Sequence, residues 1–168
     1  MGTTVKYQNT KIDATESATE IAALIRQHGG TRFEMIWDDD GELEAIRFAI
    51  RVEDMGEVPV RLGVQTRRIF EQLWKSNLGG SVYDEERHDL IRKQANRIAW
   101  RNLKDYLERA LQTVESGLLP LFEVFMAHIE VWDDLAGKNV TMSEYMIRRA
   151  HTLKDGRGIS LNPAKKDS

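Results

Sequence analysis

Lysines and arginines are concentrated in one predicted helical segment, and they are the side chains of this sequence best suited to bind a ligand. Residues 87–104 carry six lysines and arginines against a single acid, Asp89. At the periodicity of an α-helix, four of these cations share one face and an aromatic residue lies at its border. The members of this basic face are Lys93, Arg97, Trp100, Arg101 and Lys104. Clustered cations bind phosphates by displacing counterions and an aromatic ring can stack on a base, so the pattern indicates contact with DNA or RNA.

A solvated helix face explains the same basic pattern, since Asp105 follows Arg101 and Glu108 follows Lys104 at i,i+4 spacing. A second basic surface is expected on the outer face of a sheet, where strand alternation gathers four arginines near Glu34. These arginines are Arg32, Arg47, Arg51 and Arg61. They would attract an anion, but the aromatic residues with which sheet-based RNA binders stack bases are missing there. An ordinary polar exterior of a one-faced sheet is the alternative.

No catalytic or cofactor motif is recognisable. The four histidines lack the spacing of a metal site, and there is no cysteine to act as a nucleophile or ligand. The run 38–40 of three aspartates precedes Gly41, which is typical of a hairpin turn rather than of a magnesium site. His128 lies among apolar residues and is interpreted as a hydrogen-bonded core histidine. We therefore expect no catalytic residue, no metal and no cofactor, although a cleft formed by residues distant in sequence would leave an enzyme open.

Hydrophobic periodicity predicts the elements that position these side chains. A Ser17–Glu20 capping box opens a helix at about 18–28. Alternating residues at 33–37 and 46–52 predict two strands joined by the Asp-Gly turn, and Pro59 places a third strand, 58–62, at a sheet edge. A further helix is expected from Gln65 to just before the Asn77–Gly80 breaker. The remaining helices are expected at 84–116 with an Asp84 cap, at 119–131 as the most buried helix, and at 142–151 after a Thr141–Glu144 capping box. The inward stripe of the long helix is expected at Ile91, Ala95, Ile98, Ala99, Leu103, Tyr106, Ala110 and Val114.

These elements predict an α+β fold: an N-terminal helix, a three-stranded antiparallel meander, and a mostly helical C-terminal two thirds with one long helix. A chain of 168 residues with 41% apolar and 30% charged residues is expected to form a single domain over 1–153, followed by a flexible basic tail, 154–168. The net charge of −3 gives no global attraction to nucleic acid or to anionic membranes. No signal peptide or membrane segment is recognisable, so the protein is expected to be soluble and cytoplasmic.

Three segments resemble a group of uncharacterised small proteins of tailed bacteriophages and prophages. They are Arg97–Tyr106 (RIAWRNLKDY), Leu121–Phe125 (LFEVF) and Thr141–Tyr145 (TMSEY), within a likeness that spans residues 11–147. The resemblance implies a viral accessory protein made in a bacterial host cytoplasm, encoded near replication and recombination functions. It implies no established activity.

Two functions are expected from the residues and the resemblance. The first is a non-catalytic phage accessory protein that associates with nucleic acid through the basic helix face. The alternative is a protein-interaction or anti-defence module that docks on a host or phage protein, as a homo-oligomer formed through exposed apolar residues of the helices.

Overall fold

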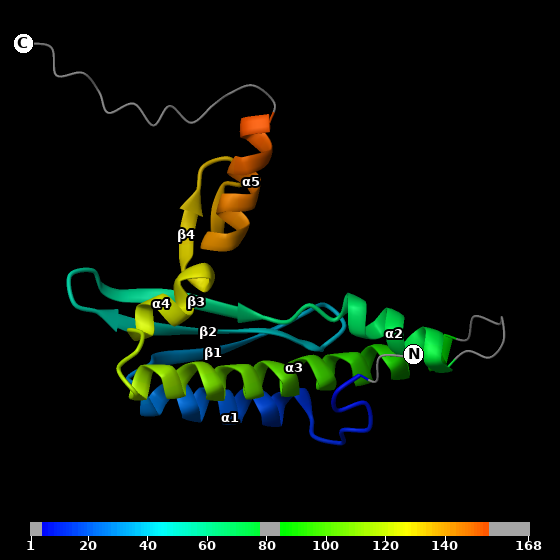
Figure 1. Ribbon diagram of the computed structural model, residues 1–168. Coiled ribbons are helices and arrows are strands. Elements are labelled where there is room, and N and C mark those ends of the chain that lie inside the picture. The colour runs from blue at the N-terminus through cyan, green and yellow to red at the C-terminus, as the bar shows by residue number, and fades with distance from the viewer. Residues whose placement is uncertain (1–4, 78–84, 155–168) are drawn as a thin grey trace, which may run out of the picture.

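The computed structural model describes residues 5–77 and 85–154, and these residues form the α+β fold that the sequence predicts. The elements in chain order are α1 (Ala14–Gln27), β1 (Thr31–Trp37), β2 (Leu43–Val52), β3 (Gly56–Gly63), α2 (Arg67–Asn77), α3 (Glu85–Glu115), α4 (Leu121–Phe125), the 3-10 turn η1 (Met126–His128), β4 (Glu130–Asp133), β5 (Lys138–Thr141) and α5 (Met142–Lys154). The first three strands form one antiparallel sheet in the order β1-β2-β3. In Figure 1, α1 and α3 lie side by side against one face of this sheet.

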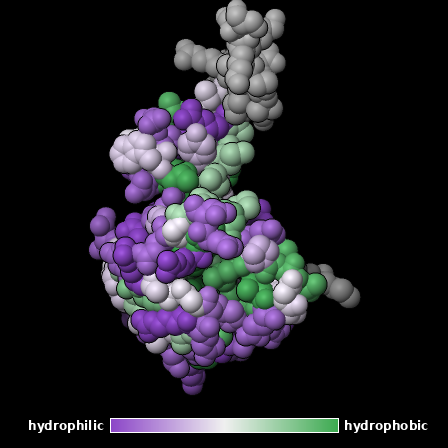
Figure 2. Space-filling view, turned by 90° about the vertical axis from the view of Figure 1, so that its left-hand side faces the viewer, coloured by the Kyte–Doolittle hydropathy of each residue, from purple (hydrophilic) through white to green (hydrophobic). Residues whose placement is uncertain are grey.

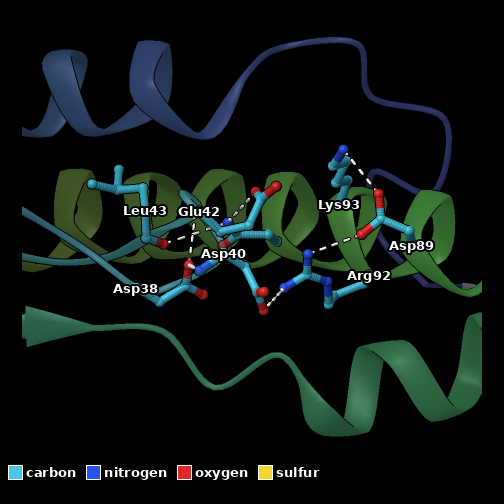
Figure 3. Close-up of polar contacts among 8 residues, drawn as sticks. Asp38, Asp40, Glu42, Leu43, Asp89, Arg92 and Lys93 are labelled. Carbon is cyan, nitrogen blue, oxygen red and sulfur yellow. Dashed lines mark hydrogen bonds and ion pairs between the residues drawn. The ribbon is translucent and has the colours of Figure 1, made fainter.

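The meander is confirmed, and its first turn forms for the predicted reason. Asp38 accepts backbone hydrogen bonds from Asp40 and Glu42 at 3.0 and 2.8 Å, while Gly41 takes a positive φ of 77°. The acids of this turn therefore close a hairpin, as Figure 3 shows. Pro59 lies in β3 at the edge of the sheet, as expected of a residue with no N–H for a ladder.

The first helix begins earlier than the sequence analysis places it. Its N-cap is Asp13, whose carboxylate accepts a hydrogen bond from the Ala14 N–H at 2.7 Å. Ser17 lies inside the helix and is fully buried, so the Ser17–Glu20 capping box does not form. The buried positions Ala14, Ser17 and Ala18 extend the apolar stripe back by one turn.

The long helix is continuous, but it has two apolar stripes on opposite sides. In its first half, Ile91, Ala95 and Ile98 pack with Leu73 of α2. In its second half, the core-facing residues are Trp100, Leu103, Leu107, Leu111 and Val114, which pack with α1 and the sheet. Of the predicted stripe, Leu103 and Val114 also pack on this second core, but Tyr106 is exposed. The change of side follows from the change of neighbour along α3, and the predicted Asp84 cap lies outside the described residues.

The predicted buried helix at 119–131 is wrong. Its residues form the short α4 and η1 and then enter β4, which pairs with β5 in a second antiparallel hairpin. Only Phe125 of α4 is buried, where it meets Phe48 edge-to-face at 5.2 Å between ring centroids. Asp133 shapes the hairpin turn by accepting the Leu135 N–H at 3.0 Å, and Gly137 has a φ of 63°. The sequence predicted one helix at 119–131 because a short apolar run has no period that distinguishes a helix from a strand.

We call residues 130–154, which comprise β4, β5 and α5, the arm; the rest is the body. The arm rises from the sheet face opposite α1 and α3 (Figure 1). The Thr141–Glu144 capping box that opens α5 is confirmed, with the Thr141 N–H donating to Glu144 at 2.8 Å and the Glu144 N–H donating back to the Thr141 hydroxyl at 3.3 Å. The predicted tail beyond Lys154 lies outside the described residues.

Candidate functional site

The basic helix face forms on α3, but carboxylates neutralise most of it. Lys93 pairs with Asp89 at 2.9 Å, Arg101 pairs with Glu20 of α1 at 2.8 Å, and Lys104 pairs with Glu108 at 2.8 Å. Only the last of these pairs is one of the expected i,i+4 pairs. The other expected acid, Asp105, instead forms an ion pair with Lys6 at 2.7 Å and accepts a hydrogen bond from the Tyr7 hydroxyl. Both contacts lower the pKa of Asp105.

Trp100 does not lie at the border of this face as a stacking surface. Its side chain is 0% exposed, and the indole N–H donates to the Leu43 carbonyl at 3.0 Å. Asn96 also donates to this carbonyl, at 3.4 Å. The tryptophan thus fixes α3 against the start of β2, because a buried indole needs a polar partner. A base cannot reach its ring in this fold.

Ion pairs also connect α3 to the first hairpin (Figure 3). Arg92 binds Asp40 of the turn at 2.6 Å and Asp89 at 2.9 Å. The Lys93 and Arg92 cations lower the pKa of Asp89, and Asp89 in turn raises the pKa of both. The Asp38–Asp40 run therefore serves the turn and this network. No three His, Asp or Glu side chains of the described ranges 5–77 and 85–154 are arranged to hold a metal.

The four arginines of the second basic surface are also mostly paired. Arg47 and Arg61 are direct cross-strand partners, as alternation predicts. Arg47 binds Glu34 at 3.1 Å and Glu130 of the arm at 2.9 Å, and Arg61 binds Glu44 at 2.9 Å. Arg32, which has a φ of 56° where the β1 register shifts, binds Glu57 at 2.8 Å. Arg51 alone of the four has no carboxylate partner within the described part of the chain.

A polar pocket of about 240 Å³ lies at the root of the arm. Residues from β2, β3, η1 and the start of α5 line it, among them Glu44, Arg61, His128, Ser143 and Glu144. His128 is half-buried, and burial lowers its pKa, so the imidazole is neutral at pH 7. Its ring nitrogens make no hydrogen bond with any described residue, which corrects the interpretation of His128 as a hydrogen-bonded core histidine. No sequence motif announced this pocket, because its residues are brought together only by the arm.

Large exposed apolar side chains are concentrated in one stretch of the sequence. Of the eleven that are exposed among the described residues, seven lie between residues 118 and 147. Those of the body surround α4 and are Leu118, Leu119 and Met126; those of the arm are Trp132, Leu135, Met146 and Ile147. Figure 2 shows apolar atoms on the body below the arm and further ones on the arm itself.

The resemblance to phage proteins stays a prediction. None of the described helices combines the length and apolar character needed to cross a membrane. In comparisons with known proteins, no family model, no curated protein and no solved structure matches the chain.

Proposed function

We propose that the protein is a non-catalytic docking module whose arm binds another protein. The observation that carries this proposal is the exposure of four large apolar side chains on 25 residues of arm. Trp132, Met146 and Ile147 are 61%, 58% and 61% exposed, although each belongs to a regular element that could have turned it inward. Protein interfaces are enriched in aromatic residues and methionine, which supply large contact areas.

The charge distribution supports protein docking over nucleic-acid binding. Cations that already have carboxylate partners within the fold release fewer counterions when a phosphate approaches, so they contribute less to binding a polyanion. On α3 this holds for Lys93, Arg101 and Lys104. Among the residues that the structure describes, Arg97 has only a long contact of 3.5 Å with Gln94. The aromatic that would stack on a base, Trp100, is buried.

Photo-crosslinking in cells that produce the protein tests the docking proposal. A photoreactive phenylalanine is placed at Trp132 or at Ile147 on the arm, and at Glu16 as a control on the exposed side of α1. We expect discrete adducts from the two arm positions and none of comparable yield from Glu16. The double variant Met146→Glu with Ile147→Glu, which changes only exposed side chains, should abolish the adduct from Trp132 or reduce it several-fold.

Equal labelling from all three positions would show that the arm contacts nothing specifically, and the docking proposal would then be abandoned. The mass of each adduct, measured by gel and by mass spectrometry, identifies the class of partner. Binding to nucleic acid that Arg97→Glu with Arg101→Glu removes would support the alternative interpretation.

A further inference from the structure

We infer that a pocket on the body, away from the arm, binds a free α-amino acid in its zwitterionic form. The pocket has a volume of about 180 Å³ and lies where the start of α1, the end of β1, the first hairpin turn and α3 meet. We call it the α1–α3 pocket. This inference concerns a different surface from the arm, so either proposal can fail without the other. The side chains that line the pocket include Asp13, Thr15, Trp37, Glu42, Lys93 and Arg97.

Three charged side chains of the α1–α3 pocket form no ion pair with any residue that the structure describes. Arg97 is half-buried and makes only one long contact, of 3.5 Å, with a neutral side chain. Asp13 uses Oδ1 to accept the Ala14 N–H at 2.7 Å, and Glu42 uses Oε2 to accept a hydrogen bond from Asn96 at 3.2 Å. The guanidinium and the second oxygen of each carboxylate are therefore available to a ligand.

Opposite charges line the α1–α3 pocket without meeting across it. Arg97 lies beyond ion-pair distance of both Asp13 and Glu42, whereas Lys93, the other cation of the lining, pairs with Asp89 at 2.9 Å. An α-amino acid carries a carboxylate and an ammonium on one carbon, so it can present its carboxylate to the guanidinium and its ammonium to the two acids. A phosphate would meet the same two carboxylates unfavourably, and the pocket therefore suits a zwitterion better than an anion.

Trp37 gives the α1–α3 pocket an apolar wall. It is the last residue of β1, and its side chain is 50% exposed. A partly exposed indole provides a large flat surface on which another ring can pack. The pocket volume of about 180 Å³ is below the range of roughly 300–1,000 Å³ that is usual for drug-sized ligands, so a single amino acid suits it better than a nucleotide. These features favour an amino acid with an aromatic side chain, such as L-phenylalanine.

Titration of the ¹⁵N-labelled protein with L-phenylalanine, followed by NMR, tests the inference at the pocket itself. Each of the four tryptophans gives one indole N–H signal, so the pocket has its own reporter in Trp37. The Trp37 signal should shift with a dissociation constant on the order of 0.5 mM, as expected of a small ligand in an open pocket. The other three indole signals should stay in place, because none of those tryptophans lines the pocket.

Analogues of L-phenylalanine that lack one charge test whether both charges are needed. The ammonium is missing from 3-phenylpropionate, and the carboxylate is missing from phenethylamine. Each analogue should bind about tenfold more weakly, because each leaves one side of the pocket without its charged hydrogen bonds. Glycine keeps both charges but has no ring to pack on Trp37, and it should also bind more weakly than L-phenylalanine.

Variants that remove one charge test the residues. Arg97→Gln should weaken the binding of L-phenylalanine about tenfold. Asp13→Asn keeps a side chain that caps α1, and Glu42→Gln keeps an oxygen that can accept from Asn96, so each should weaken binding several-fold with the fold intact. Arg51→Gln removes a guanidinium at the other end of β2 and, as the matched control, should leave the dissociation constant unchanged. Unmoved indole signals of the other three tryptophans show that each variant is folded.

A Trp37 signal that does not move at about 10 mM L-phenylalanine, well above the expected dissociation constant, would overturn the inference. Binding of 3-phenylpropionate as tight as that of L-phenylalanine, or tighter binding of adenosine 5′-monophosphate, would show that the pocket selects anions and would overturn the zwitterion. Unchanged binding by Arg97→Gln would overturn it too, because the ligand carboxylate would then have no cation to meet. None of these results bears on the crosslinking of the arm.

Discussion

The indole of Trp100 points into the core, where its N–H meets the carbonyl of Leu43. From the sequence, Trp100 lies between an apolar and a basic side of α3, and either environment would suit it. Its burial depends on α1 lying alongside, which places Glu20 against Arg101 on the same flank. Residue type and helical spacing therefore predict the position of such a side chain on its helix, but the neighbouring helix decides whether solvent reaches it.

The environment of His128 also differs from the one that its neighbours in sequence predict. Apolar neighbours in sequence suggested a satisfied core histidine, yet the folded chain sets it at the wall of a polar pocket. The half-buried ring is neutral because burial lowers its pKa, and the charged groups that line the same pocket are Arg61, Glu44 and Glu144. The sequence could not predict this, because the arm that forms the pocket begins just after His128.

We predict that His128 makes the protein less stable in mild acid. Its pKa in the folded protein lies below the unfolded value of about 6.5, so the unfolded chain binds more protons as the pH falls below that value. The free energy of unfolding should therefore be highest above about pH 6.5 and should decrease as the pH falls toward the folded-state pKa. Urea unfolding of the wild type and of His128→Gln at pH 7.5 and 5.5 measures the effect.

The difference between the two pH values should be smaller in His128→Gln than in the wild type. His151→Gln, at an exposed position of α5, is the matched control and should keep the wild-type difference. Glu144 acts in another window, because the Thr141 N–H holds its pKa below the usual value and its contribution is lost only below about pH 4.5. An unchanged difference in His128→Gln would contradict the prediction.

At the scale of elements, the sequence was most informative where strong local signals agree. The Asp38–Gly41 turn, the alternation in β2 and the Thr141–Glu144 capping box each have a local chemical cause, and all three are present. The second hairpin was missed because β4 and β5 have only four residues each, too few for alternation to be visible. Short strands are defined by what they pair with, and that information is not local.

The capping box should stabilise the arm measurably. Thr141→Ala removes the hydroxyl that accepts the Glu144 N–H, and we expect a loss of about 1 kcal/mol in the free energy of unfolding. Thr141→Ser keeps the hydroxyl and should cost only a few tenths of that amount. Thermal unfolding followed by circular dichroism compares the three proteins. Equal losses for Ala and Ser would show that the methyl group, rather than the cap, stabilises this position.

At the scale of the whole molecule, cations and acids are matched between distant segments. Glu20 of α1 serves both Arg101 at 2.8 Å and Lys104 at 3.8 Å on α3. A count of charges along α3 alone finds an excess of cations. The folded surface has a much smaller excess of positive charge there, because acids from other segments pair with these cations. The α+β class was predictable from the order of elements, but the surface potential was not.

Removing this compensation should make the α3 face attract polyanions. Glu20→Gln frees Arg101 and Lys104 of their shared carboxylate, and we expect tighter binding to heparin and to single-stranded DNA at low salt than the wild type shows. Glu16→Gln makes the same change of net charge on an exposed part of α1 and is the matched control. Elution from heparin at two salt concentrations measures the difference. Strong binding by the wild type itself, lost in Arg97→Glu with Arg101→Glu, would instead favour the nucleic-acid function.

The ion pair between Glu130 and Arg47 has a consequence for how the molecule tumbles. The Glu130 side chain is 4% exposed and meets Arg47 at 2.9 Å, so lifting the arm from the sheet would break a close ion pair between residues 83 positions apart in sequence. A second tie is the hydrogen bond that the Met142 N–H of the arm donates at 2.8 Å to the carbonyl of Ile129, a residue that forms a β-bridge with Val60 of the sheet. Arm and body should therefore rotate in solution as one particle, and the backbone amides of β4 should relax with the same rotational correlation time as those of β2.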